Sequence, residues 1–248
     1  VKLKVPTTYW CCVNCPGNPG AWKRHAVYHK KVKGNRKKTE DGGVMQQRAR
    51  EDAERAARYA AQTGDAYMEL MAEGIRYLSK EDWRRAARAY REAIALRPDR
   101  PEAYFNLGSA LNSSGHKAEA AQRFLEAKER YPVGSEKWAR ATAAAFDMLA
   151  REVCAEVPKP EWWNDEELKV LSARVVRAAP NEVAAYMMRA HVLCGRSCGA
   201  WVAGSRSTAE LKKAATRYAR AAVLHPAPVM KEMLAELAAW CLSQVGAV

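Results

Sequence analysis

A 34-residue period constrains the fold of this chain more than any other feature of its sequence. When residues 67–98 are superimposed on residues 101–132, similar residue types coincide at six positions. The pairs are Gly74 and Gly108, Tyr77 and Leu111, Ala86 and Ala120, Tyr90 and Phe124, Ala93 and Ala127, and Pro98 and Pro132. Small residues let two antiparallel helices approach, large residues fill the space between one hairpin and the next, and the proline stops the second helix. We therefore expect each unit to be a helix-turn-helix hairpin.

The second copy carries the complete set of these positions: Tyr104, Leu107, Gly108, Leu111, Ala120, Phe124, Ala127 and Pro132. This pattern resembles the tetratricopeptide repeat, a helical hairpin of the same period. The resemblance implies an all-α solenoid in which the first helix of each hairpin lines a concave groove. Because about three or more such units are needed to bury their faces, we expect the flanking segments to supply the others.

The flanking units follow the same pattern with wider spacing. The prolines that close the hairpins, Pro132, Pro180 and Pro226, are 48 and 46 residues apart, so the third and fourth units carry inserts. We expect two regular repeats over residues 67–134, two expanded repeats over about 135–226, and a C-terminal capping helix over 228–243, all within a helical domain of residues 45–248. A charged helix beginning at Met45 is expected to cover the other end.

The inserts are located by residues that break helices. Around "VCAEVPKPEWWNDEE", Pro158 and Pro160 are expected to end a long first helix before Asn164 or Asp165 caps the next one. The segment "GRSCGAWVAGSRST" has the composition of a loop. The second helix of the third unit matches the repeat least well, because the alignment from its closing proline puts Leu168, Ser172 and Val175 where Ala, an aromatic residue and Ala are expected.

Residues 1–44 form a separate, basic segment. The first 40 residues hold ten Lys or Arg and one acidic residue, so they carry +9 of the net charge of +13. A basic arm on a nearly balanced body indicates an appended tail, which we expect to be disordered. Since the first methionine is Met45, residues 1–44 are alternatively the end of a longer chain.

The arm contains the ligand types of a two-Cys, two-His zinc site. Cys12 and Cys15 precede His25 and His29, with nine residues between the two pairs. This spacer is shorter than the roughly twelve residues of the usual finger, so a zinc-finger-like segment and a solvated arm both stay open. A second cluster, His191, Cys194 and Cys198, lies largely on a repeat helix, where a buried Cys and a groove-facing His are routine, and we expect it to be structural.

Composition and motifs exclude several classes of function. No apolar run approaches the about 18 residues of a membrane span, and seven scattered cysteines fit a reducing compartment, so we expect a cytoplasmic or nuclear protein. No phosphate-binding Gly-rich loop, no metalloprotease motif and no nucleophile elbow occurs, and a solenoid presents an open groove. We therefore expect no enzymatic activity and no cofactor apart from zinc in the arm.

The resemblance implies a protein-binding adaptor or scaffold whose groove receives a peptide or helix. Carried onto this sequence, the family's groove positions are Met68, Met71, Ile75, Phe105, Asn106, Ser109, Asn112, Arg140, Ala143, Phe146, Met187 and His191. Family members that clamp a chaperone tail share two of five polar positions with this chain, Asn106 and Arg140, so a chaperone-tail co-adaptor is not expected. The alternative function is a nucleic-acid-associated protein whose arm touches RNA or DNA while the repeats recruit a partner.

Overall fold

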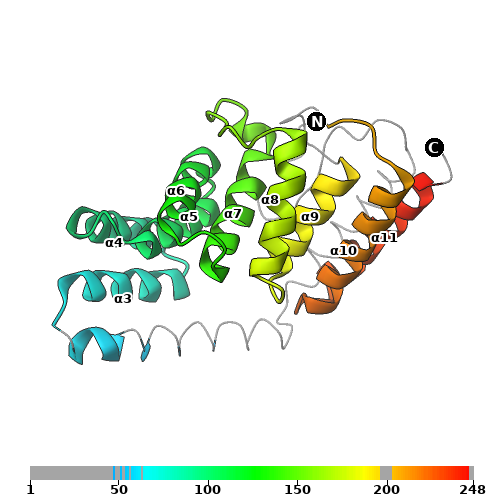
Figure 1. Ribbon diagram of the computed structural model, residues 1–248. Coiled ribbons are helices and arrows are strands. Elements are labelled where there is room, and N and C mark those ends of the chain that lie inside the picture. Colours follow the sequence, from blue (N-terminus) through cyan, green and yellow to red (C-terminus); the bar gives the residue numbers. More distant parts are fainter. Residues whose placement is uncertain are drawn as a thin grey trace, which may run out of the picture.

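The computed structural model shows a row of antiparallel helices stacked side by side (Figure 1). It describes residues 47, 51, 54–55, 57–62, 64–195 and 203–245. In this part of the chain all regular secondary structure is helical, as the sequence predicts. None of the described helices is long and apolar enough to cross a bilayer. The architecture is an all-α solenoid.

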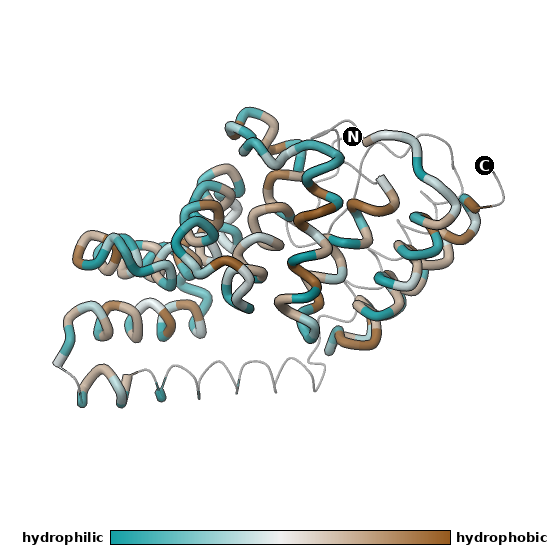
Figure 2. Tube along the Cα trace, viewed as in Figure 1, coloured by the Kyte–Doolittle hydropathy of each residue, from teal (hydrophilic) through white to brown (hydrophobic). Residues whose placement is uncertain are grey.

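The helices are α3 (Ala66–Ser79), α4 (Trp83–Leu96), α5 (Pro101–Ser114), α6 (Lys117–Arg130), α7 (Glu136–Leu149), the short 3-10 helix η1 (Glu152–Cys154), α8 (Asp165–Ala178), α9 (Val183–Cys194), α10 (Thr208–Leu224) and α11 (Pro228–Val245). Each α-helix packs against the one that follows it. Successive hairpins are therefore α3 with α4, α5 with α6, α7 with α8, and α9 with α10. Hydrophilic and hydrophobic residues are interspersed along the helices (Figure 2), as expected for helices that bury one face against their neighbours.

Side-chain caps fix where many of these helices begin. Asp65, Asp82, Ser135, Asn164 and Ser207 each accept a hydrogen bond from a backbone N–H in the first turn of the helix that follows. These bonds satisfy backbone donors that have no partner inside the helix. The caps therefore fix the first residues of these five helices.

Gly108 is the point of closest approach in the best-matched hairpin. A Cβ atom there would lie 2.8 Å from Cε1 of Phe124, and the ring of Tyr90 lies over Gly74 in the same way. The expected need for small residues is confirmed. The expected place of Phe124 between hairpins was wrong, because its ring packs inside its own hairpin, over Gly108 and 5.3 Å from the ring of Phe105.

The third unit fills the same space with polar groups. Leu168, Ser172 and Val175 are fully buried, so the register aligned on the closing proline holds although the residue types differ. Where regular units carry an aromatic ring, the Ser172 hydroxyl accepts a hydrogen bond of 3.0 Å from Nη1 of Arg189 on α9. A guanidinium from the next hairpin thus bonds to the side chain that stands at the position of the missing ring.

The first insert is a folded loop rather than an extension of α7. We expected Pro158 and Pro160 to end a long first helix, but α7 has the regular length of 14 residues and the chain then turns through η1. Trp163 near the end of the insert is buried, and its ring lies 5.5 Å from that of Phe146 on α7. After α7 ends, the insert thus folds back onto the solenoid.

The second insert is anchored by a network of charged side chains. The Arg206 guanidinium donates to both carboxylate oxygens of Asp165 on α8, at 2.7 and 2.5 Å, and its side chain is 6% exposed. Lys169 Nζ lies 3.2 Å from Asp165 Oδ2 and 3.0 Å from Glu210 Oε1. The hydrogen bonds from Arg206 hold the pKa of Asp165 well below its usual range. Burial opposes ionisation of Glu210, but bonds from the Ser207 backbone and Lys169 lower its pKa to about 2.

Helical segments cover both ends of the stack. Residues 57–62 are helical and run alongside α3, and Ala60 among them is buried (Figure 1). At the other end, α11 buries Leu234 and Cys241 and packs against α10. It ends at Val245, two residues beyond the expected boundary.

Candidate partner-binding face

The first helices of the second and third hairpins place their predicted groove residues in contact. Phe105, Asn106 and Ser109 on α5 are half-buried, and Phe105 packs against the core while keeping part of its surface open. Arg140 on α7 is exposed, and its guanidinium carbon lies 5.6 Å from the centre of the Phe105 ring. An aromatic ring, a cation and two small polar side chains therefore share one surface, which we call the α5–α7 face.

Ion pairs hold the two helices of this face in register. Lys137 Nζ lies 3.0 Å from Glu102 Oε1, which links α7 to α5, and Arg140 Nε lies 3.2 Å from Glu182 Oε1 at the start of α9. Burial disfavours the charge of Glu102, but the hydrogen bonds from Lys137 and from the Glu102 backbone N–H, together with the charges of Lys137 and Arg100, lower the carboxyl pKa. Because the Arg140 side chain is 48% exposed, its pairing with Glu182 leaves N–H groups available to a ligand.

Four of the predicted groove residues belong to the core. Met71, Ala143, Phe146 and His191 are each less than 10% exposed. The ring of His191 lies edge-on to Tyr218 at 5.5 Å, and its Nδ1 is 2.8 Å from the carbonyl oxygen of Met187. These side chains support the fold and offer little area to a partner. The remaining apolar candidates, Met68, Ile75 and Met187, are half-buried.

The sequence-predicted zinc ligands Cys12, Cys15, His25 and His29 lie outside the described residues, as does Cys198. Within the described residues no three His, Cys, Asp or Glu side chains come together as a metal site would require. Cys194 is buried, with its Sγ 3.6 Å from the Tyr218 hydroxyl. It thus serves the packing between α9 and α10.

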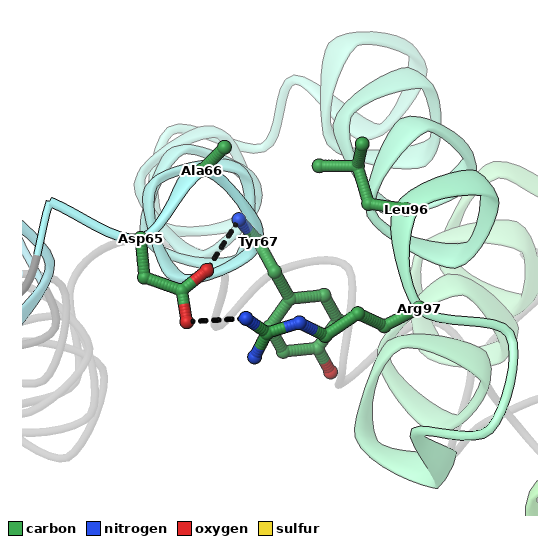
Figure 3. A pocket seen from close by; sticks show the side chains of 5 residues that line it. All are labelled: Asp65, Ala66, Tyr67, Leu96 and Arg97. Atoms are coloured by element: carbon green, nitrogen blue, oxygen red, sulfur yellow. Dashed lines mark hydrogen bonds and ion pairs between the residues drawn. The ribbon is translucent and has the colours of Figure 1, made fainter.

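A hollow of about 490 Å³ lies where α3 begins and α4 ends (Figure 3). Asp65 accepts a hydrogen bond from the Tyr67 backbone N–H with one carboxylate oxygen and pairs with Arg97 at 2.9 Å through the other. The Arg97 guanidinium lies over the Tyr67 ring, with its carbon 5.3 Å from the ring centre. Sequence reasoning missed this arrangement, because the repeat period does not assign a role to either Arg97 or Tyr67.

A second hollow, of about 630 Å³, lies on the outer face of α4 and is lined by Asp82, Arg84, Arg85, Arg88 and Arg91. Three of these arginines form ion pairs: Arg85 with Asp82, Arg88 with Glu92, and Arg91 with Glu119. The side chain of Arg88 is 81% exposed. The repeated charge of this helix is thus mainly a solvated surface with local ion pairs.

A comparison with family profiles agrees with the hairpin geometry of the two regular units. The family profile described as "Tetratricopeptide repeat" matches residues 71–135. Among solved structures, "Crystal structure of MamA protein" resembles this chain with a TM-score of 0.48 and 15% identity, over 75% of this chain and 88% of that one. The search of curated protein sequences finds no match. The match falls on the two regular hairpins and identifies residues 71–135 as tetratricopeptide repeats.

Proposed function

We propose that this protein is a binding scaffold that holds a segment of a partner protein against the α5–α7 face. The observation that carries the proposal is the contact between Phe105 and Arg140, two partly exposed side chains from neighbouring first helices. Stacked repeats create an extended surface of this kind, and aromatic and Arg residues are those that most often dominate binding energy at protein interfaces.

The chemistry of the face favours a segment with an apolar anchor beside a carboxylate. The open part of Phe105 offers apolar area, while the planar fork of Arg140 can donate two parallel hydrogen bonds to a carboxylate. Asn106 and Ser109 add neutral polar groups on the same helix, although the Ser109 hydroxyl already donates to the Phe105 carbonyl at 3.1 Å. Ile75 and Met187 extend the apolar candidates to the hairpins on either side.

Two substitutions test the proposal: one removes apolar contact area, and the other reverses a charge. Phe105→Ala removes buried contact area and should weaken capture of native partners by about tenfold, mainly through faster dissociation. Arg140→Glu reverses the charge and should weaken capture most at low ionic strength, because salt screens the repulsion. Arg88→Glu makes the same charge reversal on the outer face of α4 and should leave capture unchanged.

The measurement is capture of native partners by the full-length chain, with thermal melting to confirm that each variant folds. Loss of the same partners from Phe105→Ala and Arg140→Glu, but not from Arg88→Glu, is the expected result. If all three variants retain every partner, the α5–α7 face is not the binding surface.

A further inference from the structure

Arginine side chains cover the same aromatic position in three successive hairpins. The aromatic residue near the start of the first helix is Tyr104 in the second hairpin, Trp138 in the third and Tyr186 in the fourth, and all three rings are buried. A guanidinium carbon lies near the centre of each ring. The distances are 4.2 Å from Arg130 to Tyr104, 5.4 Å from Arg174 to Trp138 and 5.9 Å from Arg217 to Tyr186. Because the rings occupy equivalent places in the stack, the guanidinium groups form a row along one edge, which we call the arginine edge.

The row extends into the first hairpin with a shift of one helical turn. There the covered ring is Tyr67, three residues before Leu70, which is the counterpart of Tyr104 in the 34-residue alignment. Arg97 and Arg100 lie 5.3 and 5.8 Å from this ring (Figure 3 shows Arg97). Both are paired with carboxylates, at 2.9 Å to Asp65 and 3.6 Å to Glu102.

The arginines reach these places from different positions in their repeats. Arg130, Arg174 and Arg217 precede the closing prolines of their hairpins by two, six and nine residues. Copying one ancestral repeat would leave the arginine at a single position. Placement from three separate positions is therefore independent of the 34-residue period, and it explains why the sequence pattern alone does not reveal the row.

The three arginines carry positive charge that no nearby carboxylate neutralises. Among the described residues, none of the three forms an ion pair, and Arg130 donates to the backbone carbonyls of Pro98 and Glu126. Near the fourth hairpin, burial and the charge of Arg217 lower the pKa of Arg189. Contact with the rings limits the freedom of the guanidinium groups, so a ligand that met them would cost less side-chain ordering than usual.

The arrangement disfavours nucleic acids that bind by stacking their bases on aromatic rings. Proteins that bind single-stranded nucleic acid offer open aromatic faces on which bases stack. Here the rings of Tyr104, Trp138 and Tyr186 are buried and covered by guanidinium groups, so those faces are closed to bases. The guanidinium groups can still donate paired N–H groups to carboxylates. We infer that the arginine edge is a second binding surface, separate from the α5–α7 face, and that it binds an extended acidic segment of a protein partner.

The spacing of the repeats gives the segment its expected length and period. Neighbouring helices in a stack lie about 10 Å apart, so successive hairpins of two helices lie up to about 20 Å apart, which is roughly six residues of extended chain. A segment with acidic residues about six positions apart would therefore meet one arginine per hairpin. A peptide of about eighteen residues with Glu at about every third position, and Gly or Ser elsewhere, places a Glu at every sixth position and is a suitable probe, and the same peptide with Gln in place of Glu is its control.

The test compares two triple variants of the full chain that remove equal charge. One variant combines Arg130→Gln, Arg174→Gln and Arg217→Gln on the edge, and the other combines Arg84→Gln, Arg85→Gln and Arg88→Gln on the outer face of α4. Each exposed ion pair changes the affinity by about 1.4- to 5-fold, so the edge variant should bind the Glu peptide about tenfold more weakly and the α4 variant less than twofold more weakly. The basic arm is the same in both, so its contribution cancels.

Fluorescence anisotropy with labelled peptide at low salt gives the affinities, and thermal melting checks the variants. If the triple edge variant has a lowered melting temperature, Arg174→Gln alone serves as a second test, because Arg174 is exposed. This single substitution should weaken binding of the Glu peptide about threefold. Equal binding by the edge and α4 variants would overturn the inference, as would equal binding of the Glu and Gln peptides. Single-stranded RNA is tested as a competitor. If it binds more tightly than the Glu peptide and loses affinity in the edge variant, the ligand of the arginine edge is nucleic acid and the inference of an acidic protein segment is overturned. Phe105→Ala should leave peptide binding unchanged, so this result is independent of the proposed function.

Discussion

At the scale of single residues, Gly108 fixes how closely α5 and α6 approach. The ring of Phe124 occupies the place that a side chain at Gly108 would need, so even one methyl group at this position would displace the ring. Gly108→Ala should destabilise the chain by about 1 to 3 kcal/mol, the usual cost of overpacking a well-filled core. Chemical denaturation measures the change, and Ser109→Ala on the same helix should shift stability by less than about 0.5 kcal/mol. An unchanged midpoint for Gly108→Ala would contradict the packing described here.

The sequence predicts such packing only where the repeat is regular. The small and aromatic residues of the first two hairpins recur every 34 residues, and their contacts follow from that spacing. In the third hairpin the aromatic residue is absent, and the groups that replace it, Ser172 with Arg189, lie on different hairpins. Their partnership depends on how α8 and α9 stack, which no local pattern encodes. For the same reason the burial of Met71 and Phe146 could not be read from their repeat positions.

At the scale of elements, the first insert contributes to the core of the third hairpin. Trp163 is buried against Phe146, whereas Val153 in the same insert is 65% exposed. Trp163→Ala should cost about 3 to 5 kcal/mol, because it leaves a large cavity between the insert and α7. Val153→Ala is the matched control and should cost less than about 0.5 kcal/mol. Equal effects of the two substitutions on the urea midpoint would show that the insert does not pack as described.

The network that anchors the second insert makes stability depend on acidity. The pKa of Glu210 falls to about 2 in the folded chain, below the value of about 4.3 for a Glu in an unfolded chain. A lowered pKa means that the unfolded chain binds the proton more readily. The stabilisation is therefore complete above about pH 4.3 and is lost as pH falls toward 2. Asp165, whose pKa is also lowered, acts in the same direction.

Replacing one member of the network should reduce this acid sensitivity. Between pH 5 and pH 2.5, Glu210→Gln should lose less of its urea midpoint than the unmutated chain, because it lacks one titrating group of the network. Glu232→Gln, an exposed position on α11, should behave like the unmutated chain. A loss in Glu210→Gln as large as that of the unmutated chain would show that the network does not contribute.

At the scale of the whole molecule, helices stacked in one row bring side chains from distant parts of the sequence onto shared surfaces. Phe105 and Arg140 meet because α5 and α7 are equivalent helices of neighbouring hairpins, and a family resemblance is enough to predict that. The arginine edge is of another kind, since its members do not share a repeat position. The repeat period thus gives the α5–α7 face, and only the folded chain gives the second surface.

The central claim is that a partner lies on the α5–α7 face, and cross-linking from a single position tests it most directly. A photoreactive amino acid placed at Ser109 in the full chain lies beside Phe105, and one placed at Arg88 lies on the outer face of α4. Illumination in the native extract should join a protein of discrete mass to the Ser109 variant and not to the Arg88 variant. Cross-linking of that protein from Arg88 instead, or no product from Ser109, would contradict the claim.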